Sequence, residues 1–187
     1  MSYNPKKRFL DIISIPRDTK IAVKGTSIKK INQLYAYTYK KTKSHYASAK
    51  SVRDELQKIL GDDIPFYAQI DYNGFRDFID ALGGVKIEIV NPMNYDDNWG
   101  NLHIHFSTGV HLLNGQRSLE YVRYRTGDRA DLDRILRQQG FIREVMSRLK
   151  EPRVIVNFPK IVEILYKNIH MNISVWDVFT IIYELRD

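Results

Sequence analysis

The sequence predicts an α/β domain in which helices pack against a mixed β-sheet, and three observations support this fold class. The chain has 187 residues and a hydrophobic content of 43%, enough for one globular domain with a sizeable core. Short alternating segments, such as 85–90 (VKIEIV) and 102–106 (LHIHF), are typical of strands with one wet face. Amphipathic stretches of helical period lie between these segments, and such interspersion indicates a layered α/β architecture.

The first half of the chain is expected to hold three strands and two helices. Pro16 ends the first strand, because proline cannot donate to a strand ladder. Asn32 is a good N-cap for a tyrosine-rich helix, and Gly61 provides the stop of the next helix. The expected elements are strands at 9–15, 20–23 and 66–71 and helices at 33–41 and 44–60.

The second half is expected to begin with a helix that Gly83 and Gly84 end, and Pro152 should interrupt a later helical region. A polar loop is expected over 91–101, and Asn114 with Gly115 leads into a short helix. The expected elements are helices at 75–82, from 131 onward, at 154–169 and at 174–185, and strands or extended segments at 85–90, 102–106 and 121–125.

The composition points to an anionic partner. The net charge is +7 and the isoelectric point is about 9.5, so nucleic acid, anionic lipid or a phosphorylated substrate would each be attracted. The absence of cysteine suits an extracytoplasmic protein, although cysteine-free cytosolic proteins are also ordinary. No apolar run reaches the roughly 20 residues of a membrane span, and the chain starts in what reads as a strand already under way. We therefore expect an excised domain.

The most informative stretch is 117–139, RSLEYVRYRTGDRADLDRILRQQ, which has arginines and no lysine. Arginine is a planar fork that binds phosphate or carboxylate through paired hydrogen bonds, whereas lysine is a point charge. If 121–125 is extended, Arg123 and Arg125 project to one side about 6.5 Å apart, which suits two neighbouring phosphates. The sequence therefore predicts an anion site, and a diphosphate fits it best. The alternative is a solvated basic face.

The helix that follows should add polar groups to this site. Asp131, Arg134 and Gln138 are spaced i, i+3 and i+7 and lie along one edge of the helix. The adjoining stripe should be apolar and buried, which would leave the polar edge half-buried. This stripe consists of Leu132, Ile135, Ile142, Val145, Met146 and Leu149.

Two other groups have both a functional and a simpler interpretation. Arg17 and Asp18 follow a predicted strand, so they could belong to a site or form a local ion pair in a turn. His103 and His105 share one strand face but lack an evident third metal ligand, which favours ordinary histidines. The sequence contains no GxxxxGK loop, no GxSxG elbow and no helix-turn-helix or RNA-binding signature.

A set of ordered motifs covers nearly the whole chain and resembles the LytR–CpsA–Psr family. YVRYR followed by DxxRxxRQQ is the most specific part of the resemblance. The motifs are SIPRDT (14–19), KINQLY (30–35), DYNGFRDFIDALGGVKI (71–87), GVHLLNGQRSLEYVRYR (109–125) and DLDRILRQQ (131–139).

The resemblance implies a single domain over 1–187, with a mixed central sheet flanked by helices on both sides. It implies an extracytoplasmic protein, anchored to the cell membrane and typical of Gram-positive bacteria. The implied activity is phosphotransfer of a glycopolymer, such as wall teichoic acid or capsular polysaccharide, from a polyprenyl diphosphate to peptidoglycan. The family's diphosphate-binding residues fall on Arg17, Lys30, Arg123, Arg125, Arg134 and Gln138. Its catalytic residues fall on Arg123, Arg125, Asp131 and Arg134.

The chain also departs from the family pattern. The family has a segment before SIPRD with aspartates that bind magnesium, and an N-terminal membrane anchor, and this chain starts after both. We therefore expect Mg²⁺ or Mn²⁺ as cofactor with its ligands upstream, and weak or no transferase activity from this chain. Asp133 stands where the family commonly has glycine. The polyprenyl tail needs an apolar groove, for which the candidates are Phe75, Phe78, Ile79 and Leu82, although apolar helical stripes usually face the core.

Two other functions remain open from the sequence. A non-catalytic domain could hold anionic wall polymer or lipid diphosphate without transferring it. A nucleic-acid-binding regulator would account for the basic charge and predicts binding with a steep salt dependence. The family resemblance favours the transferase, and no nucleic acid partner is expected.

Overall fold

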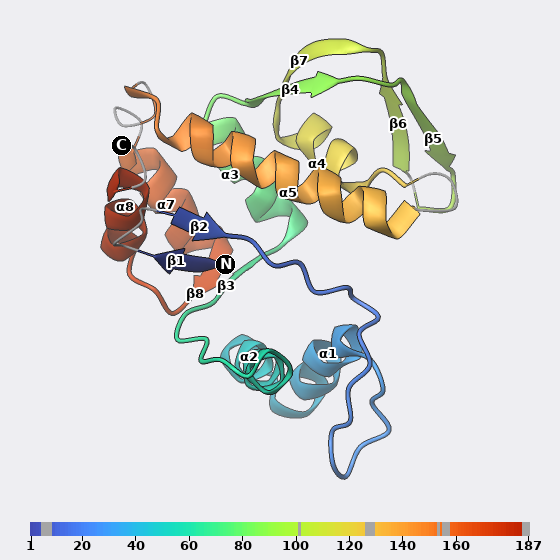
Figure 1. Cartoon of the computed structure of the whole chain (residues 1–187), viewed down its shortest axis with the longest axis vertical. Coiled ribbons are helices and arrows are strands. Elements are labelled where there is room, and N and C mark those ends of the chain that lie inside the picture. The colour runs from blue at the N-terminus through green and yellow to red at the C-terminus, as the bar shows by residue number, and fades with distance from the viewer. Residues whose placement is uncertain (5–8, 101, 126–129, 153, 155–157, 185–187) are drawn as a thin grey trace. The chain divides into compact units, whose positions relative to one another are not determined.

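The computed structural model describes the chain except for residues 5–8, 101, 126–129, 153, 155–157 and 185–187. The chain divides into two compact units, which Figure 1 shows together with the labelled elements. Unit 1 contains Met1–Ile12, Ile70–Ile169 and Val175–Asp187, and unit 2 contains Ile13–Gln69 and His170–Ser174. Each unit is described by itself below.

Unit 1 combines short antiparallel strand pairs with five helices in its described part. β1 pairs with β2, β4 with β7 and β5 with β6. α5 runs beside α4 and β4, and α3 packs against α4 and α7 (Figure 1). The elements are β1 (Ser2–Asn4), β2 (Phe9–Asp11), α3 (Tyr72–Ala81), β4 (Val85–Ile89), β5 (Met93–Asp97), β6 (Leu102–Phe106), β7 (Gly109–Leu113), α4 (Gly115–Arg123), α5 (Ala130–Leu149), α7 (Phe158–Asn168) and α8 (Val175–Glu184).

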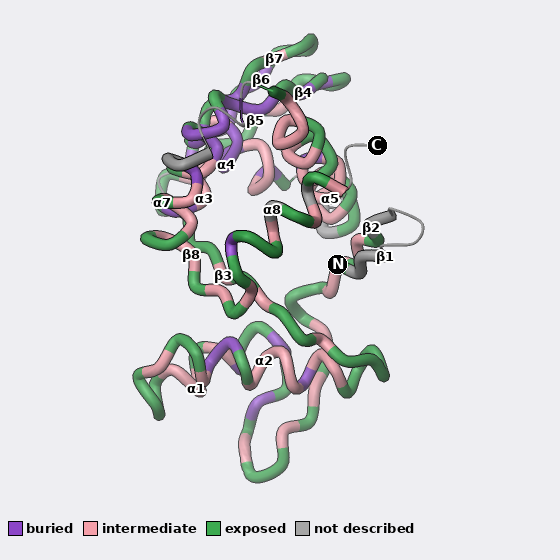
Figure 2. The backbone as a smooth tube through the Cα atoms, turned by 90° about the vertical axis from the view of Figure 1, so that its left-hand side faces the viewer, coloured by how far each residue is buried: buried purple, intermediate pink, exposed green. Residues whose placement is uncertain are grey.

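The core of unit 1 forms because β4 and β6 alternate strictly between buried and exposed residues. Figure 2 shows the buried positions gathered on these strands and on α4. Ile79 of α3, Val85 of β4 and Ile104 of β6 are completely inaccessible to water. Burying an aliphatic side chain of this size contributes about 1.5–3 kcal/mol, so this cluster stabilises the scaffold that carries α4 and α5.

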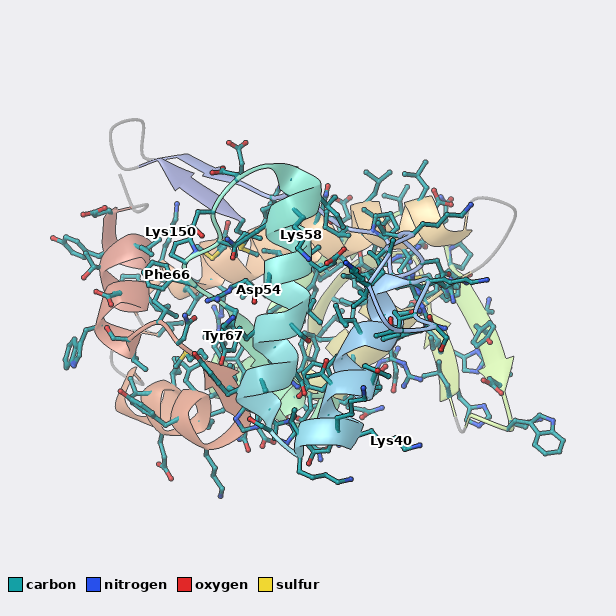
Figure 3. All side chains as sticks on the ribbon, turned by 90° about the horizontal axis from the view of Figure 1, so that it is seen from below. Lys40, Asp54, Lys58, Phe66, Tyr67 and Lys150 are labelled. Atoms are coloured by element: carbon teal, nitrogen blue, oxygen red, sulfur yellow. The ribbon has the colours of Figure 1, made fainter. Side chains whose placement is uncertain are left out.

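Unit 2 is built on two packed helices, α1 (Ile31–Thr42) and α2 (His45–Leu60). Ser44 caps α2 by accepting a hydrogen bond from the Ala47 amide at 3.2 Å, and Gly61 ends it at φ 67°. The outer side of α2 is charged, and Figure 3 shows Asp54 and Lys58 on it. These two residues form ion pairs with Lys50 and Arg53 and with Glu55, respectively.

A late segment of the chain completes unit 2. The Asn172 side chain accepts a hydrogen bond from the Tyr67 amide at 2.6 Å and donates one to the Pro65 carbonyl at 2.8 Å. Beside this contact, β3 (Ala68–Ile70) pairs with β8 (Ile169–Met171). Burial raises the pKa of the Tyr67 hydroxyl, so that hydroxyl stays neutral over a wider pH range.

The α/β class predicted from the sequence is confirmed, and every predicted helix is present with shifted ends. The described strands form four two-stranded sheets instead of one continuous sheet. β5 lies in the segment predicted as a polar loop, and β7 and β8 were not predicted either. The predicted strand at 20–23 is reduced to one bridge between Lys20 and Lys30. Among the helices in the described part of the chain, none is both long and apolar enough to cross a membrane.

Candidate functional site

The arginine-rich stretch folds into the end of α4 and the start of α5. We call this region the α4–α5 junction. It consists of Val122 to Arg125 at the end of α4 together with Arg134, Arg137 and Gln138 on α5. All of it lies in unit 1.

The sequence fixes the beginning of α4 through a cap and a close contact. Asn114 caps the helix by accepting a hydrogen bond from the Arg117 amide at 2.9 Å. Gly115 packs directly on the backbone of Arg76 in α3, where any Cβ atom would overlap the Arg76 carbonyl. α4 therefore starts at one defined place on α3, and its last turn is correspondingly well placed.

Arg123 lies in that last turn, and the prediction of an extended segment over 121–125 is wrong. The alternating pattern of YVRYR favours a strand locally. The helix nucleated at Asn114 continues through it because Leu119 is buried and Tyr121 and Val122 pack against the core. Tertiary packing thus overrides the local preference.

The helix ends at Tyr124, which is buried and has φ −54° and ψ 134°. Arg125 follows as an exposed residue, so the two predicted arginines flank a buried tyrosine at the C-terminal end of α4. The half-buried guanidinium of Arg123 lies over the Tyr72 ring at 5.0 Å. Within the described residues this guanidinium has no hydrogen bond or ion pair, so it is available to an anionic ligand.

Two residues of α5 hold the end of α4. Gln138 donates a hydrogen bond to the Val122 carbonyl at 3.2 Å, and Arg137 donates one to the Tyr124 carbonyl at 2.7 Å. These bonds satisfy carbonyls that a helix end leaves unpaired. Gln138, predicted to bind diphosphate, is therefore found bonded to the backbone beside Arg123. A ligand would have to use the second hydrogen of its amide.

Arg137 is a residue that sequence reasoning did not assign to the site. Its guanidinium lies 5.8 Å from the Tyr121 ring centroid and 5.1 Å from that of Tyr124. Burial lowers the pKa of Arg137, because the half-buried pocket disfavours its charge. The only signal in the sequence was the proximity of these two tyrosines to an arginine-rich helix.

Arg134 is half-buried and lies one helical turn before Gln138, on the same side of α5. Its position on the helix is therefore close to Gln138, and the direction of its guanidinium stays a prediction. Asp131 is in the first turn of α5, and its side chain lies outside the described residues. Leu132, predicted to be in the buried stripe, is instead 52% exposed, because the stripe starts further along the helix.

Arg17 and Lys30 lie in unit 2, where Asp18 organises them. Asp18 accepts hydrogen bonds from the Lys30 ammonium at 3.1 Å and from the Asn32 amide at 3.3 Å. The Asn32 backbone N–H donates to the Arg17 carbonyl at 3.2 Å, which ties the Arg17 loop to the start of α1. The hydrogen bond from Lys30 lowers the pKa of the Asp18 carboxyl. A diphosphate site shared by this motif and the α4–α5 junction stays a prediction from the sequence.

The four candidates for a lipid groove are core residues or partly buried residues packed on the core. Ile79 and Leu82 are buried, and Phe75 packs against Phe141 at 5.7 Å between ring centroids. Phe78 is also packed against this cluster. Ile79 and Leu82 are therefore core residues, as expected for an apolar helical stripe.

The histidine pair on β6 is exposed and bonded to neighbouring polar groups. His103 and His105 both contact the Asp96 carboxylate, at 2.7 and 3.1 Å, and His105 also contacts Asn94 at 3.2 Å. In the part of the chain that the structure describes, no group of three histidine or acidic side chains is arranged to hold a metal ion. The interpretation as ordinary surface histidines stays a prediction, and so does the magnesium cofactor.

Comparison with known proteins gives a consistent result. A model of the LytR_cpsA_psr family matches residues 1–187. The chain is 29% identical over 183 residues to the polyisoprenyl-teichoic acid–peptidoglycan teichoic acid transferase TagV of Bacillus subtilis, covering 94% of this chain and 44% of TagV. It is also 29% identical over 184 residues to the transferase TagU of the same organism, covering 95% of this chain and 55% of TagU. The chain thus spans about half the length of these relatives.

Solved structures show the same fold. The crystal structure of B. subtilis TagV matches with a TM-score of 0.76 and 24% identity, over 98% of this chain and 68% of TagV. That of TagU matches with a TM-score of 0.68 and 25% identity, over 99% and 73%. A structure of TagT described as bound to LI-WTA matches with a TM-score of 0.73 and 21% identity, over 99% of this chain and 66% of TagT.

Proposed function

The chain belongs to the LytR–CpsA–Psr family, and we propose on that basis that it transfers a glycopolymer from a polyprenyl diphosphate carrier to peptidoglycan. The observation that carries the proposal is the arginine pair at the end of α4. Arg123 is held over Tyr72 without an ion-pair partner among the described residues, and the exposed Arg125 follows one residue beyond the helix. The relatives named as teichoic acid transferases support the same activity.

The chemistry requires cationic groups because a diphosphate ester repels nucleophiles. Arg123, Arg125 and Arg134 neutralise the two phosphates and stabilise the charge that develops during in-line displacement. A hydroxyl of the acceptor sugar attacks the phosphorus nearer the glycan, and its proton passes to water. Polyprenyl phosphate leaves with the electron pair of the broken P–O bond. The family resemblance also assigns Arg17 and Lys30 to the diphosphate, and it assigns Asp131 to orienting the arginines.

The proposed partners follow from the relatives and from the charge of the site. The donor polymer is wall teichoic acid, capsular polysaccharide or a related glycopolymer, and the acceptor is peptidoglycan. The transfer takes place on the extracytoplasmic side of the cell membrane, with the whole protein anchored there. The names of TagV and TagU as teichoic acid transferases, and the description of TagT as bound to LI-WTA, support a glycopolymer donor.

A divalent cation, Mg²⁺ or Mn²⁺, is proposed as the cofactor. It would supply charge neutralisation at the diphosphate. Because the described residues contain no group of three metal-ligating side chains, we assign it no ligand, and no step above depends on it.

The turnover experiment uses a short teichoic acid on a polyprenyl diphosphate, a peptidoglycan oligosaccharide and Mg²⁺ or Mn²⁺. Because only weak activity is expected from this chain, the expected result is slow release of polyprenyl phosphate. Arg125→Lys should reduce this rate further, and Arg143→Lys, a charge-preserving control at an exposed position of α5, should leave it unchanged. Tight donor binding with no release would favour the non-catalytic polymer binder. Salt-dependent binding of duplex DNA in preference to the lipid diphosphate would favour the regulator.

A further inference from the structure

We propose that Arg137 is a positioning residue that fixes the backbone between Arg123 and Arg125, so that two guanidiniums meet two phosphates. This inference rests on the proposed function and adds a residue to its site. Arg137 does not need to touch the ligand for this role. Its contacts are with Tyr121 and with Tyr124, the residue that separates the two binding arginines.

The first argument is where the Arg137 hydrogen bond falls. Its Nη1 donates to the Tyr124 carbonyl at 2.7 Å. That carbonyl belongs to the peptide group whose N–H is the amide of Arg125, so a bond to it orients the peptide plane on which Arg125 depends. The neighbouring Gln138 bond to the Val122 carbonyl fixes the peptide group on the other side, which ends at the amide of Arg123.

The second argument is the position of the Arg137 guanidinium beside two aromatic rings. The flat guanidinium lies within cation–π distance of two aromatic rings, at 5.8 Å from Tyr121 and 5.1 Å from Tyr124. Tyr124 itself is buried, and Tyr121 packs in turn against Phe106 and Phe141 of the core. Arg137 therefore links the end of α4 to a rigid aromatic cluster.

The third argument is electrostatic. A cation near the C-terminal end of a helix is favourable because that end carries partial negative charge. Removing a half-buried cation that bonds a helix-end carbonyl would leave that carbonyl unpaired. The chain would then leave α4 along a less defined course, although Arg123 and Arg125 would keep their own side chains and charges.

This arrangement predicts that loss of Arg137 weakens diphosphate binding selectively. A diphosphate needs both arginines at a set spacing, whereas a monophosphate can be bound by one of them. Disturbing the spacing should therefore weaken diphosphate binding much more than monophosphate binding. A general loss of charge or of folded protein would lower both affinities together.

The experiment measures binding of geranyl diphosphate and geranyl monophosphate by calorimetry on the whole chain, for wild type, Arg137→Leu and Arg137→Lys. We expect Arg137→Leu to weaken diphosphate binding about tenfold and monophosphate binding less than about twofold. Arg137→Lys should be intermediate, because lysine keeps one donor but not the planar group. Arg143→Leu removes the same charge from an exposed position of α5 and should change neither affinity.

Each outcome decides the matter. Equal weakening for both ligands in a folded variant would overturn the positioning role, because it would indicate a general loss of charge at the site. An unchanged diphosphate preference in Arg137→Leu, or full restoration by lysine, would also overturn it. A wild type without any diphosphate preference would overturn the proposed function, and this inference with it. Circular dichroism confirms folding, and if Arg137→Leu does not fold, Tyr121→Leu removes one wall of the pocket and is expected to reduce the same preference.

Discussion

The guanidinium of Arg123 lies over the ring of Tyr72, with 5.0 Å between the guanidinium carbon and the ring centroid. The two residues come from different helices, Arg123 from the last turn of α4 and Tyr72 from the first residue of α3. Tyr72 is 59% exposed. Its ring covers one face of the Arg123 guanidinium and leaves the opposite face of the guanidinium accessible. This contact sets the direction of the guanidinium without using any of its hydrogen-bond donors.

A substitution of Tyr72 should therefore weaken ligand binding only if it removes the aromatic ring. Tyr72→Phe keeps the ring and should bind geranyl diphosphate as wild type does. Tyr72→Leu loses a cation–π contact worth about 0.5–1 kcal/mol, which corresponds to roughly a two- to fivefold weaker affinity. Calorimetry on both variants checks this, with Tyr166→Leu, an exposed tyrosine of α7, as control. Equal effects of Tyr72→Leu and Tyr166→Leu would contradict the supporting role of the ring.

Arg125→Lys should impair binding of geranyl diphosphate even though it preserves charge. Lysine cannot present two parallel donors to one phosphate, so about 1.5–3 kcal/mol should be lost, or roughly ten- to a hundredfold in affinity. Arg143→Lys on the exposed side of α5 should change the binding free energy by less than about 0.5 kcal/mol. Arg129, which the segment TGDRAD predicts to be solvated, lies outside the described residues. Binding isotherms at two salt concentrations decide the matter. Equal weakening by Arg125→Lys and Arg143→Lys would indicate a diffuse basic face.

Asp18 should make stability depend on acidic pH. The Lys30 hydrogen bond lowers the pKa of this carboxyl below its ordinary 3.8, so its contribution is present above that value. The contribution is lost as the pH falls through the lowered folded-state pKa. Asp18→Asn should therefore melt below wild type at neutral pH, and the difference should shrink only below about pH 4. Thermal unfolding over this range measures it. Asp62→Asn, at an exposed residue that accepts a hydrogen bond from the adjacent Asp63 amide, is the matched control.

Two glycines in helices of unit 1 should respond oppositely to alanine. At Gly115 a Cβ atom would overlap the backbone of Arg76, so Gly115→Ala should destabilise the protein by about 1–3 kcal/mol. At Gly140, inside α5, a Cβ atom meets nothing within 4 Å, so Gly140→Ala should stabilise it by about 0.5–1 kcal/mol. Urea unfolding of both variants tests the pair. A neutral Gly115→Ala would show that α4 can shift on α3.

Local signals in the sequence located the elements that depend on local chemistry. The strand over Leu102–Phe106 has the expected bounds, and α2 begins only one residue later than expected, because a strict alternation defines the strand and Gly61 ends the helix. β5 could not be found in this way. Its sequence MNYDD has no apolar alternation, and it is held as a strand by its register with β6.

In the candidate site too, the sequence predicted local features and missed those that depend on contacts between helices. The residue types of the arginine stretch were informative, because they predicted an anion site and named Arg123, Arg125 and Arg134. The backbone that carries them was mispredicted, since α4 continues through Arg123. The roles of Tyr72 and Arg137 depend on contacts between helices, which no spacing along the chain reveals.

The contact between Asn172 and the segment at Tyr67 also bears on how the chain folds during synthesis. These hydrogen bonds join residues that are 105 and 107 positions apart, so Asn172 is made long after Tyr67 and Pro65. At a translation rate of about 5–20 residues per second, the Pro65 and Tyr67 backbone waits roughly 5–20 s for its partner. During that interval α1 and α2 can pair through their nearby contacts, while β3 has no strand beside it. The α1–α2 pair can therefore form first from contacts that are local in the sequence, but unit 2 is closed only once Asn172 is available.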